Sequence, residues 1–307
     1  MSTGRAIGAL REIWRHPVKS MGGESIGETA IEKRFGVVGD RAWAIRDLAA
    51  GEIRGAKKIP ELMLLGARYV DAPRERESAV VELDLGDGRR VRSDDPAVSE
   101  RLTERLGRAV RLCPRMPADD RAHYRRARPI TDPEAEVREA SGLLPGEATP
   151  AMEAPVDLSI VGEYVSPPGT YFDFFDLHLL STRSLERFAG LVPEATVEAR
   201  RFRPNLVVEL ESPRAGETPG TSAPAPAAGW PELEWVGRVL AIGDLRFELT
   251  MPMMRCGMTT QAQPGLGREP RIMRALVRAC GMNLGVGATV VRAGSVRVGD
   301  AVRVVEG

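Results

Sequence analysis

The sequence predicts a mainly β fold with some α, in which two β-barrel-like domains carry short helices on their rims. Three observations support this prediction. Short apolar stretches with strand-like character outnumber stretches with helical periodicity. Many of the 32 glycines stand between these stretches, where the chain must turn. A length of 307 residues favours two domains over one.

The first half of the chain contains a succession of expected strands. Residues 6–20 alternate loosely, and residues 25–47 form two strand-like runs broken by glycine. Further strands are expected in residues 62–72 and 79–94. The last of these stretches contains Asp87-Gly88, a pair typical of hairpin turns.

A helix is expected to start after Asp95, which can cap it, with Pro96 in its first turn. Its apolar stripe consists of Val98, Leu102 and Leu106. Residues 114–136 then lack apolar periodicity and are polar and rich in proline. We interpret them as the connection between two domains, with a solvated basic face rather than a nucleic-acid-binding patch. The expected units are residues 1–115, a connector 116–145, and residues 146–307.

The second half repeats the pattern. Residues 178–193 predict a strand that runs into a helix capped by Ser181 or Thr182. Residues 201–210 predict a strand, and residues 212–229 have the composition of a flexible surface loop. A hairpin-like pair is expected in residues 232–250, and valine-rich strands in residues 288–307. Between them a helix is expected whose apolar face carries Ile272, Leu276, Ala279 and Cys280.

The composition excludes several classes of function. Lys plus Arg and Asp plus Glu both number 43, so the net charge favours neither nucleic acid nor an anionic membrane. No apolar run is long enough to cross a bilayer, and the first twenty residues lack the pattern of a signal peptide. The three cysteines have no zinc-site spacing. We therefore expect a reduced, cytoplasmic protein.

Among the cysteines, Cys256 stands apart, in the turn-prone stretch MPMMRCGMTTQAQPG. Cys280 lies on an apolar helix face and Cys113 ends a strand-like run, which indicates small core residues. Arg255 precedes Cys256, and a neighbouring guanidinium favours the thiolate that binds metals or attacks electrophiles. The residues alone leave a functional and an incidental thiol equally open.

The three histidines offer no clear partner for this thiol. His16, His123 and His178 stand at no metal-ligand spacing, and no catalytic motif includes them. His178 is the best candidate for a Cys–His pair through space. The alternative for each is a hydrogen-bonded structural residue or a surface residue.

Polar and basic residues at turns suggest a binding site for an anionic cofactor. Each by itself is more often a solvated side chain, but together they have the chemistry of a phosphate site. A helix that begins at Ser181 and Thr182 would add backbone donors. The turn residues are Lys19, Ser20, Arg41, Arg203 and Asn205.

Six stretches in order give the chain a family resemblance. They are PVKSMGGES, VVGDRAW, DLHLLSTRSL, RFRPNLVV, MRCGMTTQ and GSVRVGDAV. The chain resembles the MOSC proteins, named after the C-terminal domain of molybdenum-cofactor sulfurases, with the companion N-terminal β-barrel domain in front. It looks most similar to bacterial relatives of the mitochondrial amidoxime reducing component.

The resemblance implies a molybdenum cofactor (molybdenum held by molybdopterin). Cys256 would be the thiolate ligand of the metal, and soft sulfur donors suit such a metal. The residues implied to hold the pterin and its phosphate are Lys19, Ser20, Arg41, Ser181, Thr182, Arg203, Asn205 and Arg255. The implied activity is reduction of N-hydroxylated compounds such as amidoximes and hydroxylamines.

The sequence also departs from the family pattern. Met253 and Met254 precede Arg255 where a Pro-Cys pair is common, and Gln261-Ala262-Gln263-Pro264 replaces an acidic ending. We expect these differences to affect the choice of substrate more than cofactor binding. The chain contains no cysteine cluster, so we expect a separate iron–sulfur, flavin or haem protein to donate electrons. A non-catalytic carrier of the cofactor or of sulfur is the alternative function.

Overall fold

The computed structural model describes residues 4–149, 157–212, 214 and 229–305. Seven strands form a closed barrel, because β1 (Ala6–Arg15) pairs with β12 (Leu206–Leu210) as well as with β17 (Ala301–Val304). All neighbouring pairs are antiparallel except β11 and β12. In order around the barrel the strands are β12 (Leu206–Leu210), β11 (Leu177–Ser181), β15 (Asn283–Arg292), β14 (Leu245–Met254), β13 (Val239–Ile242), β17 (Ala301–Val304) and β1 (Ala6–Arg15).

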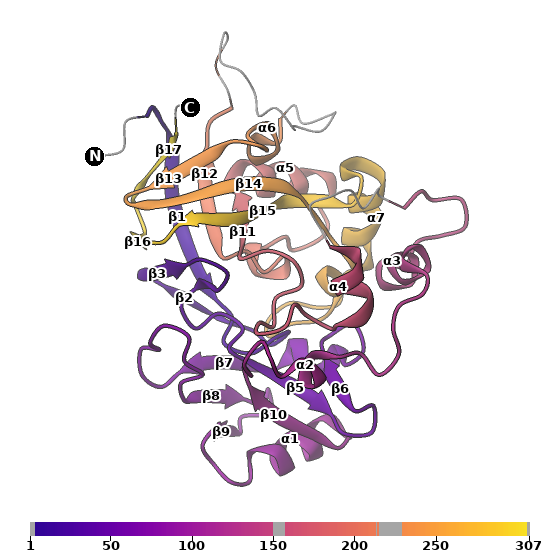
Figure 1. Cartoon of the computed structure of the whole chain (residues 1–307). Helices are drawn as coiled ribbons and strands as arrows, with labels where there is room; N and C mark the ends of the chain where they lie inside the picture. The colour runs from indigo at the N-terminus through magenta and orange to yellow at the C-terminus, as the bar shows by residue number, and fades with distance from the viewer. Residues whose placement is uncertain (1–3, 150–156, 213, 215–228, 306–307) are drawn as a thin grey trace.

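The barrel closes where the first strand meets the middle of the chain. Gly8 of β1 lies opposite Leu210, and Ile13 lies opposite Leu206. A Cβ atom on Gly8 would lie 1.8 Å from the carbonyl oxygen of Glu209, so only glycine allows this approach. The barrel therefore takes strands from both halves of the chain (Figure 1).

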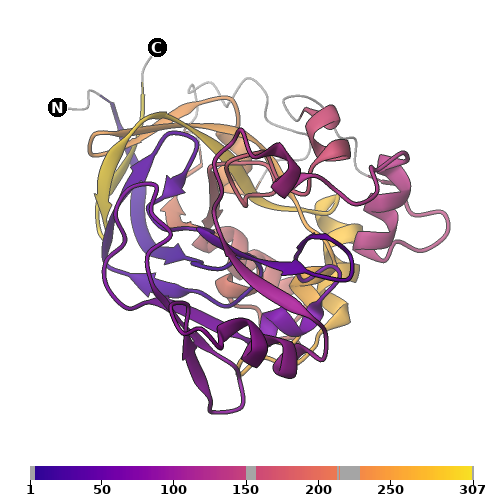
Figure 2. The same ribbon diagram turned by 60° about the horizontal axis from the view of Figure 1, so that its bottom comes forward.

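Smaller sheets lie to one side of the barrel (Figures 1 and 2). One contains β10 (Val110–Pro114), β5 (Trp43–Asp47) and β6 (Glu52–Arg54), and another contains β7 (Gly66–Tyr69), β8 (Val81–Asp84) and β9 (Arg90–Arg92). A third joins β16 (Gly294–Arg297), β3 (Glu28–Glu32) and β4 (Gly36–Val37), while β2 (Glu24–Ile26) extends the barrel at β1. The expected domain limits stay a prediction. Strands β1 and β3, which belong to the first half of the chain, pair with strands from the second half.

Short helices cover the sheets, and the predicted mainly β fold with short helices is confirmed. The three helices expected from the sequence are α1 (Val98–Leu106), α5 (Thr182–Leu191) and α7 (Pro270–Cys280). The others are α2 (Arg121–Tyr124), α3 (Pro133–Ser141), α4 (Leu158–Glu163), α6 (Pro231–Glu234) and the 3-10 turns η1 (Pro60–Leu64), η2 (Ala199–Arg201) and η3 (Gly257–Thr260). No helix in the described part of the chain is both long and apolar enough to cross a membrane.

The expected loop of residues 212–229 lies largely outside the described residues. The expected connector contains α3, whose ends carry local signals. At its start, the Asp132 carboxylate accepts a hydrogen bond from the Ala135 backbone at 3.0 Å, and Pro133 occupies the first turn. At its end, Gly142 adopts the left-handed backbone conformation. These signals were present in a segment that lacks clear apolar periodicity.

A buried carboxyl group lies on α6, which packs against β11, β14 and β15. The Glu232 side chain is fully buried, accepts a hydrogen bond from the Ser184 hydroxyl, and leaves Oε1 without a partner among the described residues. Burial raises its pKa from 4.5 to about 7, while the Ser184 hydrogen bond opposes the rise. The folded protein therefore binds this proton more tightly than the unfolded chain does.

This carboxyl should make stability fall as pH rises. Its contribution is full below the unfolded pKa of 4.5 and is lost as pH rises towards about 7. The difference is on the order of 3 kcal/mol. Glu232→Gln cannot ionise, so we expect it to remove this part of the pH dependence and to be more stable than wild type at pH 8. Urea unfolding of wild type and of Glu232→Gln at pH 5 and pH 8 measures both effects. If the free energy of unfolding changes equally with pH in the two proteins, the assignment to Glu232 is wrong.

Candidate functional site

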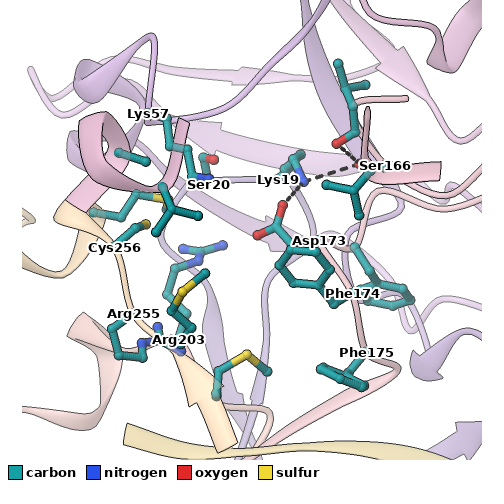
Figure 3. A pocket seen from close by; sticks show the side chains of 18 of the residues that line it. Lys19, Ser20, Lys57, Ser166, Asp173, Phe174, Phe175, Arg203, Arg255 and Cys256 are labelled. Carbon is teal, nitrogen blue, oxygen red and sulfur yellow. Dashed lines mark hydrogen bonds and ion pairs between the residues drawn. The ribbon is translucent and has the colours of Figure 1, made fainter. Parts of the chain in front are cut away.

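One cavity lies where the barrel, the turn after β1 and the α3–α4 region meet (Figure 3). Its volume is about 200 Å³, which is room for a small molecule rather than a polymer. The end of β14 brings Cys256 to it, and the link between η2 and β12 brings Arg203. The predicted site residues in its lining are Lys19, Ser20, Arg41, Arg203, Asn205, Arg255 and Cys256.

Arg203 is a buried cation with spare hydrogen-bonding capacity. Its Nη1 donates to the Met21 carbonyl, whereas Nη2 is buried without a partner in the described part of the chain. Burial lowers the pKa of Arg203 to about 9, and the nearby charge of Arg41 adds to this effect. An unpaired buried guanidinium nitrogen is costly, so an anionic ligand would relieve it.

Arg255 has the same character beside the thiol. Its Nη2 donates to the Phe202 carbonyl at 2.6 Å, and its Nε is buried without a partner among the residues described. Burial lowers the pKa of Arg255 to about 10, and neighbouring Cys256 acts in the opposite direction. The half-buried Cys256 precedes the first residue of η3, and its carbonyl accepts a hydrogen bond from the Thr259 backbone at 3.2 Å.

A buried carboxylate orients Arg41. Asp40 accepts a hydrogen bond from the His16 backbone at 2.6 Å and pairs with the Arg41 guanidinium. Burial alone would raise the pKa of Asp40, but Arg41 and the His16 contacts outweigh it and the pKa is lowered. Burial lowers the pKa of His16 to about 3, so this imidazole is neutral. The carboxylate thus orients the Arg41 guanidinium at the cavity.

Lys19 already has its partners within the protein. Its ammonium donates to the Asp173 carboxylate at 2.7 Å and to the Ser166 hydroxyl at 3.4 Å (Figure 3). It also donates to the Tyr171 carbonyl at 2.8 Å. Burial lowers the pKa of Lys19, while Asp173 raises it in part. The Ser20 hydroxyl accepts a hydrogen bond from the Ala56 backbone at 2.9 Å. Both residues therefore support the cavity through contacts of their own.

Asn205 and His178 join β12 to β11 at the cavity. The Asn205 backbone donates to the His178 carbonyl at 2.7 Å, and the His178 backbone donates to Asn205 Oδ1 at 3.1 Å. The imidazole contacts the Arg203 carbonyl through Nδ1 at 3.3 Å, while Nε2 lacks a partner among the described residues. Burial, followed by the charge of Arg255, lowers the pKa of His178 well below its usual value. Cys256 and His178 both line the cavity, and a Cys–His pair between them stays a prediction.

Ser181 and Thr182 lie outside the cavity lining. The Ser181 side chain is fully buried, and its hydroxyl accepts a hydrogen bond from the Arg183 backbone at 3.2 Å as the cap of α5. The expected cap is thus present, but the structure does not bring it to the cavity. Their contact with a phosphate stays a prediction without geometric support.

Three cavity residues have a strained backbone. Ser20, Arg41 and Arg203 have φ values of 70°, 47° and 55°, in the left-handed region that residues other than glycine rarely adopt. Such strain persists only where surrounding contacts impose it, and it gathers at functional sites. The sequence shows no sign of it, because none of the three is glycine, Asn or Asp.

The sequence matches two domain families. Residues 7–104 match the MOSC N-terminal beta barrel domain, and residues 170–303 match the MOSC domain. The chain is a MOSC protein. The family predicted from the six sequence stretches is therefore confirmed.

Solved structures add only distant likenesses to this MOSC protein. YiiM from Geobacillus stearothermophilus is 13% identical with a TM-score of 0.29, over 43% of this chain and 55% of that one. A hypothetical protein is 14% identical with a TM-score of 0.30, over 43% of this chain and 53% of that one. The chain thus spans about half the length of these two proteins. The YUAD protein from Bacillus subtilis is 11% identical with a TM-score of 0.42, over 99% of this chain and 98% of that one. A comparison with curated proteins gives no match.

Sequence reasoning missed one side of this MOSC cavity. The residues from Arg126 to Pro167 that line it belong to α3, α4 and their flanking loops, between the two matched stretches. Asp173 and Phe174 at the mouth were missed as well, although they stand in the conspicuous stretch FDFFD. The local signals for the missed helical side were the caps of α3 and the carboxylate of Asp157, which caps α4.

Proposed function

We propose that this MOSC protein binds a molybdenum cofactor and reduces N-hydroxylated compounds. One observation carries the proposal: the half-buried thiol of Cys256 shares a cavity with Arg203 and Arg255, whose guanidinium groups each bury an unpartnered nitrogen among the described residues. A soft donor beside unsatisfied cations is the chemistry that a thiolate-bound metal on a phosphorylated pterin requires.

The residues of the cavity fit this cofactor in kind. Cys256 would be the metal ligand, and Arg203, Arg255 and Arg41 would offset the phosphate charge. Lys19, Ser20 and Asn205 would position these groups through the contacts they make within the protein. When bound, the metal supplies the exchange of two electrons with the substrate.

The reaction consumes two electrons and two protons for each N–OH group. The N–O bond breaks, one proton joins the hydroxyl group, which leaves as water, and the other proton binds to the nitrogen. The protein contributes binding, orientation and exclusion of bulk water within the cavity. We propose that the electrons arrive from a separate iron–sulfur, flavin or haem protein and that the protein works in the cytoplasm.

Protein made in a host that synthesises the cofactor tests the proposal. We expect about one molybdenum and one pterin per chain, and reduction of benzamidoxime to benzamidine with a reduced viologen dye. The dye replaces the natural donor, so a missing partner does not prevent turnover. Cofactor-loaded protein that fails to reduce several amidoximes and hydroxylamines would favour the carrier function. Protein that takes up neither metal nor pterin would refute both.

A further inference from the structure

The cavity has two chemically different sides. Arg203 and Arg255 lie on one side, close to Cys256 (Figure 3), and Arg41 lines the same cavity. We call the other side the α3–α4 wall, defined by its apolar residues Ile130, Pro133, Val137, Ile160 and Val161. Arg126 also lines this side, but its Nε donates to the Val161 carbonyl at 3.0 Å and is held by the wall itself.

Further apolar residues of the cavity lining come from outside this wall. Phe174 and Phe175 follow Asp173, and Met253 and Met254 precede Arg255. Phe174 is 37% exposed. The two methionines are among the residues by which the chain departs from the family pattern.

Backbone pairing holds the wall in place. Arg126 N donates to the Glu163 carbonyl at 2.9 Å, Ile130 N to Gly162 at 2.9 Å, and Val165 N to Tyr124 at 2.9 Å. Buried Tyr124, Tyr164 and Tyr171 form a cluster against which Ile160 of the wall packs. The wall is therefore a preformed surface rather than a loose loop.

The wall belongs to neither matched domain. The matched stretches end at residue 104 and resume at residue 170, and every residue of the wall lies between them. The wall therefore adds a surface to the cavity outside the residues that match the two MOSC domains. This surface can determine which substrate the chain prefers.

We propose that the α3–α4 wall selects N-hydroxylated substrates with a bulky apolar body, such as an aryl group, over small polar ones. The inference rests on the proposed function. With the cationic side holding an anionic cofactor, the apolar side is left for the organic part of the substrate. Burying an aryl ring against it should favour an aryl amidoxime over acetamidoxime by on the order of 10- to 100-fold.

The test separates binding from turnover. Calorimetry without an electron donor compares benzamidoxime with acetamidoxime, and steady-state kinetics with dye compares their kcat/KM. Val161→Thr keeps the shape of the side chain and Ile130→Thr shortens it, and both add a hydroxyl to the wall. We expect each to reduce the preference for benzamidoxime by roughly 3- to 10-fold, because the hydroxyl is desolvated by the aryl ring.

Two further variants keep the result interpretable. Leu191→Thr, at a position 45% exposed on α5 and outside the cavity, should leave the preference unchanged. Phe174→Ser lies at the exposed mouth, so it reports on the apolar side even if a wall variant fails to fold. Thermal melting identifies such a failure.

Each outcome decides the inference. Equal binding of the two compounds by wild type overturns it, whatever the turnover. A preference that survives both wall variants overturns the assignment to α3–α4. Preferential binding of benzamidoxime that the wall variants weaken supports the inference, and if neither compound is then reduced, only the proposed reductase function fails.

Discussion

Cys256→Ser is expected to lower kcat for benzamidoxime by at least about 100-fold. Residues that only support a metal ligand already change affinity or activity by roughly 10- to 100-fold, and this substitution replaces the proposed ligand itself. A serine hydroxyl is a harder donor and loses its proton far less readily than a thiol does. The arginines remain, so we expect part of the cofactor to stay bound while turnover fails.

Cys280→Ser is the matched control for this substitution. Cys280 is half-buried at the end of α7, packs against the core, and burial raises its pKa to about 12. Its replacement should cost modest stability and leave the kcat of loaded protein unchanged. Metal analysis together with viologen-linked turnover distinguishes the two variants. Turnover by Cys256→Ser at the wild-type rate would show that this sulfur is not the ligand.

Arg203→Ala is expected to weaken cofactor retention by about 2–5 kcal/mol, the usual cost of removing one member of a buried charge-assisted pair. The guanidinium is buried, with Nη2 unpartnered among the described residues and available to an anion. Arg203→Lys should recover only part of the loss, because an ammonium cannot reproduce the planar fork. Arg203 also has a φ of 55°, and alanine and lysine must both adopt the same left-handed backbone conformation at this position.

Pterin content after dialysis measures this effect. Arg183→Ala provides a control, since Arg183 lies on α5 outside the cavity lining. We expect retention in the order wild type and Arg183→Ala, then Arg203→Lys, then Arg203→Ala. Equal retention in all four proteins would exclude Arg203 from the phosphate site.

Much of the cavity could be predicted from short stretches of sequence. Lys19, Arg41, Arg203 and Cys256 come from four separate turns, and the structure brings all four to one cavity. Their roles towards a cofactor stay predictions. The contacts of Lys19 could not be predicted, because its partners Ser166, Tyr171 and Asp173 lie more than 140 residues away.

Local patterns by themselves predicted most of the strands, the helices α1, α5 and α7 and the identity of the family, because alternation, caps and motifs act between neighbours in the chain. Only the tertiary structure decided that β1 closes the barrel against β12, that Ser181 caps a helix away from the cavity, and that α3 and α4 supply an apolar wall. The physical reason is that residues distant in the sequence bury a side chain and leave its polar atoms with or without hydrogen-bond partners. Arg203 Nη2 is buried without a partner among the described residues only because the barrel and the turn after β1 enclose it.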